Sequence, residues 1–193
     1  MKEIREILLR GCANDDRTSQ KELYQILYAP LYRVSCRYYT NEEDALTAMH
    51  NAFLKILDNL EKYRYDKSFM NWSKTILIHV IIDDLRKKKK WKNTMELEVA
   101  EANGDATGIE NEVEEIIEKE YVNQLLDRLP PASRTVFNLF VFEGYSHKDI
   151  ARELKISEGT SKWHVSQARG LMKKIIAEAR LREEQLFKAE YRQ

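Results

Sequence analysis

The architecture is decided by a stretch near the end of the chain, residues 146–169, which reads SHKDIARELKISEGTSKWHVSQAR. Ser146, followed three residues later by Asp149, has the form of an N-terminal helix cap, and Ser157 offers the same capping hydroxyl a few residues on. Two helices joined by about three residues form a helix-turn-helix. The stretch therefore predicts two capped helices that cross closely, the first over 150–154.

The second of these helices has an apolar face and a polar face. Val165, Ala168 and Met172 recur at helical spacing and are expected to point inward. The opposite face carries basic, amide and hydroxyl side chains, which can neutralise phosphates and hydrogen-bond base edges in a major groove. A helix hairpin with a solvated polar face is the alternative. The predicted duplex-reading side chains are Lys162, Trp163, Ser166 and Gln167, with Arg169 and Lys173 at the flanks.

Composition excludes several classes of protein. The 193 residues are 43% hydrophobic and 33% charged with six Gly and three Pro, which excludes collagen-like, low-complexity and wholly disordered chains. Lys plus Arg equals Asp plus Glu, 32 each, so no global basic excess is present. Two cysteines without CxxC spacing indicate neither a disulfide scaffold nor a zinc site. No apolar run reaches the roughly 20 residues that span a bilayer, so we expect a cytoplasmic protein without membrane insertion.

Charge is segregated along the chain and divides it into parts. Six of the seven residues over 86–92 are basic, whereas 96–120 holds ten acids and one lysine. Within the acidic stretch, 103–108 has turn chemistry and no apolar periodicity, which is typical of a flexible connector. The predicted organisation is a first helical domain over 1–92, an acidic linker over 93–115, a helix-turn-helix domain over 116–180 and a helical C-terminal extension over 181–193.

The first domain shows helical periodicity almost throughout. Residues 40–43 (Thr-Asn-Glu-Glu) resemble a capping box, and Ser68 can cap a later helix. No strand alternation of convincing length appears, so the sequence predicts an all-α fold of two small helical domains. The residues expected inward are Leu23, Ile26, Leu27, Leu31, Val34 and Tyr38 in one helix, and Ala45, Met49, Ala52, Phe53, Ile56 and Leu60 in the next.

A polar, aromatic loop lies between the helices of this domain. Tyr63, Tyr65 and Trp72 can stack on unpaired bases, while Arg64, Lys67 and the basic run over 86–90 follow the phosphate backbone. Core-plugging aromatic residues and a solvated lysine face are the alternatives.

The order of these motifs resembles the extracytoplasmic-function (ECF) group of bacterial RNA polymerase sigma factors. The first domain is similar to the second conserved region of that group, and the second domain to its fourth region. The motifs of the first are Leu23-Tyr24, Tyr28-Ala29-Pro30-Leu31-Tyr32, Asp44-Ala45, Phe53, Ser68-Phe69, Trp72, Asp83 and Leu85-Arg86. Those of the second are Leu129-Pro130, Arg134, Glu143-Gly144, Asp149-Ile150-Ala151, Ile156-Ser157-Glu158-Gly159-Thr160 and Ala168-Arg169.

The resemblance implies a sigma factor that directs core RNA polymerase to promoters. Core polymerase, double-stranded and melted promoter DNA, and an anti-sigma factor or other protein regulator are the implied partners, with no enzyme activity, cofactor, metal or small-molecule substrate. The polymerase-binding residues would be Asp44, Thr47, His50 and Asn51. The melted −10 element would be held by Tyr63, Arg64, Tyr65, Asp66, Lys67, Trp72, His79 and Arg86. The −35 element would be read by Thr160, Lys162, Trp163, Ser166, Gln167, Arg169 and Lys173.

Some positions depart from the family pattern. Thr47 and His50-Asn51 stand where an acidic residue and Gln-Glu are usual, which predicts weaker docking on polymerase and a need for another DNA-bound protein. His79 replaces an asparagine, and Trp163 replaces a small residue. The four histidines are expected at an interface or in the core (His50, His79) and on a solvated or DNA-facing helix (His147, His164).

Two other classes of protein stay open at this point. One is a stand-alone helix-turn-helix regulator that binds an operator as a dimer, and the other is a polymerase- or anti-sigma-binding protein that has lost promoter recognition. The tail over 181–193 extends the last helix or forms a docking surface for a partner.

Overall fold

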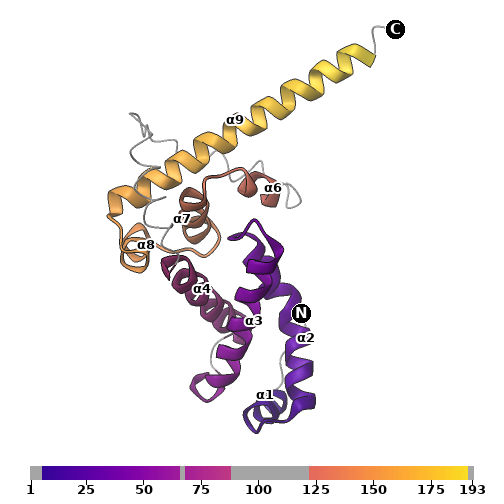
Figure 1. The fold of residues 1–193 in the computed structure, drawn as a ribbon, viewed down its shortest axis with the longest axis vertical. Helices are drawn as coiled ribbons and strands as arrows, with labels where there is room; N and C mark the ends of the chain where they lie inside the picture. Colours follow the sequence, from indigo (N-terminus) through magenta and orange to yellow (C-terminus); the bar gives the residue numbers. More distant parts are fainter. Residues whose placement is uncertain (1–5, 66–67, 88–121, 191–193) are drawn as a thin grey trace. The chain divides into compact units, whose positions relative to one another are not determined.

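The computed structural model describes residues 6–65, 68–87 and 122–190, and every regular element in these ranges is a helix (Figure 1). The all-α prediction is confirmed for this part of the chain. The first elements are α1 (Glu6–Ala13), α2 (Arg17–Cys36), α3 (Glu42–Asp58), the 3-10 helix η1 (Leu60–Lys62) and α4 (Phe69–Lys87). The later elements are α6 (Val122–Asp127), α7 (Pro131–Val141), α8 (His147–Leu154) and α9 (Glu158–Glu190).

The chain divides into two compact units, Met1–Lys88 and Lys89–Gln193. The acidic linker predicted over 93–115 lies outside the described residues. In the ranges that are described, no helix combines the length and the apolar character that crossing a bilayer requires.

Aliphatic side chains form the core of the first unit. The predicted inward stripes of α2 and α3 are buried except for Ile26 and Phe53, which are half-buried. Removing such side chains from water is the main stabilising contribution, roughly 1.5–3 kcal/mol for each fully buried one. The largest fully buried side chains of this unit are Leu23, Leu27, Leu31, Met49, Ile56, Leu77, Ile78, Ile81 and Ile82.

Helix α1 was not predicted from the sequence. Its Leu8, Leu9 and Cys12 are buried, and a Cβ added at Gly11 would clash with the side chain of Ser19 in α2. The absence of a side chain at Gly11 thus lets α1 approach α2 closely. With only eight residues, α1 depends on this packing, because isolated helices of that length are marginal in water.

One helix start in the first unit differs from the prediction by one residue. Asn41, rather than Thr40, caps α3: its Oδ1 accepts a hydrogen bond from the Asp44 N–H at 2.7 Å, and its Nδ2 donates to Asp44 Oδ2 at 2.9 Å. The predicted cap of α4 is confirmed, since the Asn71 N–H donates to Ser68 Oγ at 3.4 Å. The Asn41 cap therefore holds the Asp44 side chain at the start of α3.

The second unit closes around one apolar cluster. Helix α7 begins at Pro131, where the missing N–H is not needed, and α6 before it ends at Asp127. Ala168 and Met172 are fully buried, as predicted. The cluster comprises Leu125, Leu126, Leu129, Phe137, Ala168 and Met172, with Ile175 and Ile176 packed against it.

The predicted helix-turn-helix is present as α8 and α9. Ser146 caps α8, and Lys155 ends it in the left-handed conformation at φ 57°, which turns the chain toward α9. Ser157 caps α9, because the Thr160 N–H donates to Ser157 Oγ at 2.9 Å. Helix α9 then continues unbroken for 33 residues, so residues 181–190 of the predicted tail extend the same helix.

Candidate nucleic-acid interface

The first turns of α9 present one polar side and one buried side. Val165 is buried together with the cluster residues Ala168 and Met172, whereas Lys162 is exposed. The remaining members of the predicted duplex-reading face are half-buried: Thr160, Trp163, Ser166, Gln167, Arg169 and Lys173. The structure therefore brings all seven predicted side chains to one short length of helix, and none of them is buried.

His164 corrects one expectation. It was expected on a solvated or DNA-facing surface, but it is fully buried, with Nδ1 3.0 Å from Ser133 Oγ of α7. The Trp163 ring packs edge-on against it, with ring centroids 4.8 Å apart. His164 thus fixes α9 on α7 and supports Trp163 from behind.

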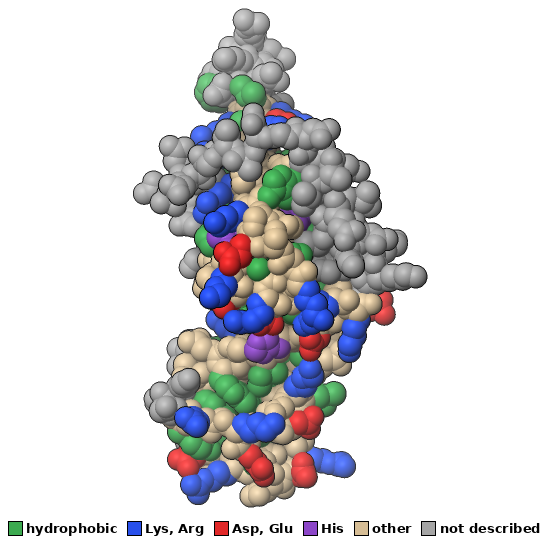
Figure 2. Space-filling view, turned by 90° about the vertical axis from the view of Figure 1, so that its left-hand side faces the viewer, with side chains coloured by type: hydrophobic (Ala, Val, Ile, Leu, Met, Phe, Trp, Pro, Cys, Tyr) green, Lys and Arg blue, Asp and Glu red, His purple; other side chains and the backbone are tan. Residues whose placement is uncertain are grey.

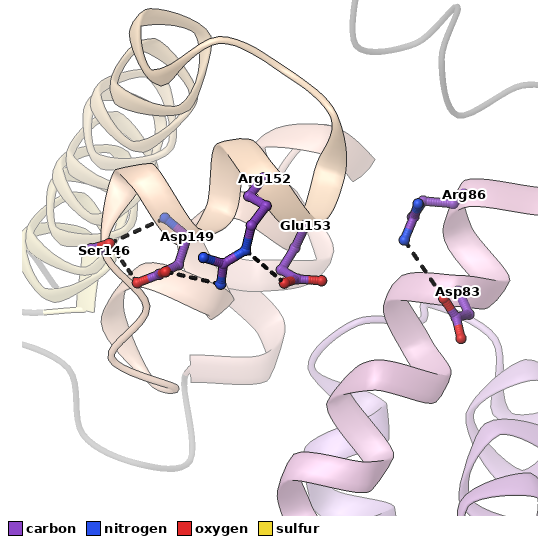
Figure 3. Close-up of polar contacts among 6 residues, drawn as sticks. All are labelled: Asp83, Arg86, Ser146, Asp149, Arg152 and Glu153. Carbon is purple, nitrogen blue, oxygen red and sulfur yellow. Dashed lines mark hydrogen bonds and ion pairs between the residues drawn. The ribbon is translucent and has the colours of Figure 1, made fainter.

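The start of α8 is held by a reciprocal cap, drawn in Figure 3. The Asp149 N–H donates to Ser146 Oγ at 3.1 Å, and the Ser146 hydroxyl donates to Asp149 Oδ2 at 2.6 Å. This hydrogen bond is the main cause that lowers the pKa of the Asp149 carboxyl. Arg152 bridges Asp149 at 3.0 Å and Glu153 at 3.3 Å, so α8 keeps its charges paired on its own surface.

His147 lies in the joint between α7, α8 and α9. Its ring stacks on Phe140 with centroids 4.4 Å apart and planes 15° apart, and its Nδ1 is 2.9 Å from Ser161 Oγ. The Arg169 guanidinium carbon lies 5.9 Å from the centroid of the same Phe140 ring. Burial first, and then the charges of Lys162 and Arg169, lower the pKa of His147. His147 was expected on a solvated or DNA-facing helix; its ring is half-buried and held on two sides.

In the first unit, an aromatic cluster forms where the loop meets α4. Tyr63 packs against Tyr65, Phe69 and Trp72, with ring centroids 5.1, 4.9 and 5.3 Å away. Tyr65 is 56% exposed, whereas Tyr63 and Trp72 are half-buried and Phe69 is buried. The exposed Tyr65 ring on a packed aromatic base is suited to stacking with an unpaired base. Arg64 beside it is exposed, and Asp66 and Lys67 lie outside the described residues.

The exposed side of α4 continues from this cluster. Trp72, His79 and Arg86 are seven residues apart, and such spacing places them on one face of a helix. His79 and Arg86 are exposed, and Arg86 lies 3.7 Å from Asp83 (Figure 3). Asp83 also lies 3.9 Å from Lys55 of α3, so it serves a surface ion pair between helices. The predicted basic run past 87 lies outside the described residues.

The predicted polymerase-binding residues share one stretch of α3. Thr47, His50 and Asn51 are exposed, whereas Asp44 is half-buried and engaged by the Asn41 cap. His50 Nε2 is 2.9 Å from the Tyr24 hydroxyl, and the two rings stack with centroids 6.0 Å apart.

Aromatic residues of α2 adjoin this stretch, and sequence reasoning did not assign them to it. Tyr24, Tyr28 and Tyr32 are four residues apart and form a ladder with centroids 5.6 and 5.7 Å apart. Leu54 of α3 is 59% exposed. The four-residue tyrosine spacing was the signal that could have identified this surface.

Among the described residues, neither the charges on the face drawn in Figure 2 nor metal ligands single out another site. Figure 2 shows Lys and Arg side chains interspersed with Asp and Glu on the face it draws, in keeping with the balanced composition. Among the described residues, no group of three His, Cys, Asp or Glu side chains could hold a metal ion. Cys12 is a buried thiol whose pKa burial raises to about 11.

Comparison with known proteins matches both units. Residues 23–91 match the family model of sigma-70 region 2, and residues 119–172 match that of sigma-70 region 4. The ECF RNA polymerase sigma factor SigM of Mycobacterium tuberculosis is 29% identical over 169 residues, which cover 88% of this chain and 83% of SigM. The RNA polymerase sigma factor NccH of Alcaligenes xylosoxydans xylosoxydans is 27% identical over 177 residues, covering 90% and 95%.

A solved structure is also similar. The sigma factor RpoE of Bartonella quintana, in complex with the anti-sigma factor NepR, aligns with a TM-score of 0.47 and 16% identity, covering 81% of this chain and 96% of that chain.

The two helical units, each matched by its own region model and in this order, define a sigma-70-type transcription initiation factor. Within that class, the chain belongs to the ECF group of RNA polymerase sigma factors.

Proposed function

We propose that this protein binds core RNA polymerase in the cytoplasm and directs it to a set of promoters, reading the −35 element with α9 and holding the melted −10 element with the first unit. The observation that carries the proposal is the polar side of α9, supported by two capped helices and a buried His164. A rigid support of this kind suits major-groove reading, because base-edge hydrogen bonds need fixed donors and acceptors.

In the duplex-reading step, Lys162, Arg169 and Lys173 bind phosphates and set the register of α9. Gln167 and Ser166 hydrogen-bond base edges, and Trp163 contacts a thymine methyl group or the sugar backbone. The half-buried positions of Trp163 and Gln167 restrict their rotamers, which favours a defined base preference.

In the melting step, the aromatic cluster around Tyr63 receives unpaired bases. Tyr65 offers an exposed ring, Trp72 continues the cluster onto α4, and Arg64 with Arg86 follows the backbone. Asp66, Lys67 and His79 are proposed contacts of the same strand. Stacking contributes roughly 1–3 kcal/mol per base, enough to hold a strand once polymerase has opened the duplex.

Polymerase binding is proposed for the exposed side of α3, with Asp44, Thr47, His50 and Asn51. The His50 ring is hydrogen-bonded to Tyr24 and stacks with it, so the surface here is more aromatic. Thr47 and Asn51 stand where the family usually has carboxylates, so the surface also carries less negative charge. Since rim charges mainly speed association, docking on polymerase is expected to be slow. This observation favours a second form of the function, in which another DNA-bound protein helps to load polymerase.

The test is capture of core RNA polymerase from the same host by the purified full chain, followed by run-off transcription on genomic promoter fragments. Stoichiometric capture with initiation supports the proposal. Capture without initiation favours the accessory-partner form, which is then sought by adding fractionated host extract. Failure of capture, together with tight operator binding by the chain alone, would favour a stand-alone regulator instead. Control by an anti-sigma factor stays a prediction, tested by co-purification with the chain.

A further inference from the structure

Three basic side chains meet at one edge of the helix-turn-helix. His147 comes from α8, and Lys162 and Arg169 come from α9, where their seven-residue spacing places them on one stripe. We refer to His147, Lys162 and Arg169 as the basic edge. Lys162 and Arg169 were expected to bind phosphates, whereas His147 was only placed on a solvated or DNA-facing helix and was not among the predicted duplex-reading side chains.

His147 is held in a fixed orientation at this edge. Its ring lies against Phe140 at 4.4 Å, while the Arg169 guanidinium carbon is 5.9 Å from the same Phe140 ring. The Ser161 hydroxyl, 2.9 Å from Nδ1, can either donate or accept. This hydrogen bond therefore survives protonation of the imidazole, so the ring need not move when its charge changes.

The charges around His147 are unbalanced in favour of positive ones. Lys162 and Arg169 face it from α9, and Glu158 is the carboxylate that opposes them. Burial acts in the same direction as the two cations, and together they lower the pKa of the imidazole. At neutral pH the ring is therefore neutral in the free protein, although it lies between two cations that attract an anion.

We propose that His147 is a phosphate-binding residue of the helix-turn-helix and takes up one proton when the unit binds duplex DNA. A backbone phosphate beside Lys162 and Arg169 supplies the negative charge that an imidazolium ion requires. The proton comes from solvent, and the protonated ring keeps its hydrogen bond to Ser161 while its other nitrogen donates to the phosphate. Promoter affinity then rises as pH falls. The inference rests on the proposed function, because it takes the polar side of α9 as the duplex-binding side.

The experiment measures the affinity of reconstituted holoenzyme for a promoter fragment between pH 6 and pH 8 at constant ionic strength. His147→Gln keeps a polar side chain but cannot become charged. The ratio of wild-type to His147→Gln affinity is expected to grow by up to about tenfold from pH 8 to pH 6, because only the wild-type side chain can take up the extra proton on binding. His147→Asn serves as a second variant, and thermal melting of each chain checks that it folds.

Lys148→Gln is the matched control, because it removes a neighbouring exposed charge of α8 and leaves His147 in place. Its affinity relative to wild type should not change with pH. The salt dependence gives a second readout: at pH 6 the wild-type slope should exceed that of His147→Gln by about one phosphate contact.

The outcomes separate this inference from the proposed function. A wild-type to His147→Gln ratio that is constant with pH, in a holoenzyme that still binds its promoter, overturns the role of His147 and leaves the sigma-factor function in place. A holoenzyme that binds no promoter fragment at any pH overturns both.

Discussion

In the second unit, the proposed base-reading groups stand on one helix, α9, whereas in the first unit the proposed strand-binding groups lie on a loop and along α4. The α9 groups are cations, an amide and a hydroxyl, supported by capped helices. The groups of the first unit are mainly aromatic rings packed edge to face, with Tyr65 exposed and Tyr63 in contact with both Tyr65 and Phe69. Duplex DNA offers phosphates and base edges, while a melted strand offers base faces, so each surface matches a different state of the same promoter.

The largest expected effect tests whether the two units are energetically separate. Leu126→Ala removes a fully buried side chain from the apolar cluster of the second unit and should destabilise that unit by roughly 2–5 kcal/mol. Amide hydrogen exchange should then increase in α7 to α9 and stay unchanged in α2 to α4. Leu77→Ala, equally buried in the first unit, should give the reverse pattern. Joint loss of protection in both units by either variant would contradict their independence.

The next largest effect tests whether the first unit binds the melted strand by ring stacking. Tyr65→Ala removes the exposed ring and should weaken the open promoter complex by roughly 1–3 kcal/mol, while binding to unmelted duplex stays the same. Permanganate reactivity of thymines in the melted region measures the change. Tyr65→Phe retains the ring and should behave like wild type. An equal loss of duplex binding in Tyr65→Ala would show that the ring acts before melting.

The next prediction, with an effect of similar or smaller size, tests how the side chains of α9 read DNA. Gln167→Ala should alter preference at one base pair, by roughly 1–3 kcal/mol if the amide makes a bidentate contact. Competition among duplexes that differ at single positions measures it. Lys162→Ala should instead weaken binding to all sequences alike and reduce the salt slope by about one. If Gln167→Ala causes the same loss on every duplex, Gln167 positions the helix and does not read sequence.

A smaller effect concerns the support of α9 rather than its contacts. Ser146→Ala removes the cap of α8 and should lower the free energy of unfolding of the second unit by about 1 kcal/mol. Ser146→Thr, which keeps the hydroxyl, is the control. Thermal unfolding followed by circular dichroism measures the loss, and an unchanged transition in Ser146→Ala would mean that the cap is dispensable.

The smallest effect is the acid sensitivity of the same cap. The Ser146 hydrogen bond lowers the pKa of Asp149 below its usual value. The stabilisation is therefore complete above the ordinary carboxyl pKa near 4 and is lost as pH falls through the lower folded value. Asp149→Asn should flatten the fall in melting temperature below pH 4 slightly. A fall as steep as in wild type would show that other carboxylates dominate acid unfolding.

The sequence predicted what depends on local patterns. Ser146 and Ser157 predicted the starts of α8 and α9, because a hydroxyl just before a helix accepts hydrogen bonds from N–H groups that have no partner within the helix. The buried side of α9 was predicted from the helical spacing of Val165, Ala168 and Met172 alone. The local pattern was ambiguous at the start of α3, because both Thr40 and Asn41 can cap a helix and the structure shows that Asn41 does so.

Tertiary packing decided the rest. Nothing in the sequence around His164 indicates that it will be buried against Ser133 of α7. Helix α1 forms because Leu8, Leu9 and Cys12 are buried in the folded unit. The stacking of His147 on Phe140 and the tilted contact of Tyr63 with Trp72 join side chains whose neighbours depend on how the helices cross. Caps and periodicity act within a few residues of chain, so sequence alone determined the helices after α1 and indicated the family, whereas α1, burial and the surroundings of each histidine required the tertiary structure.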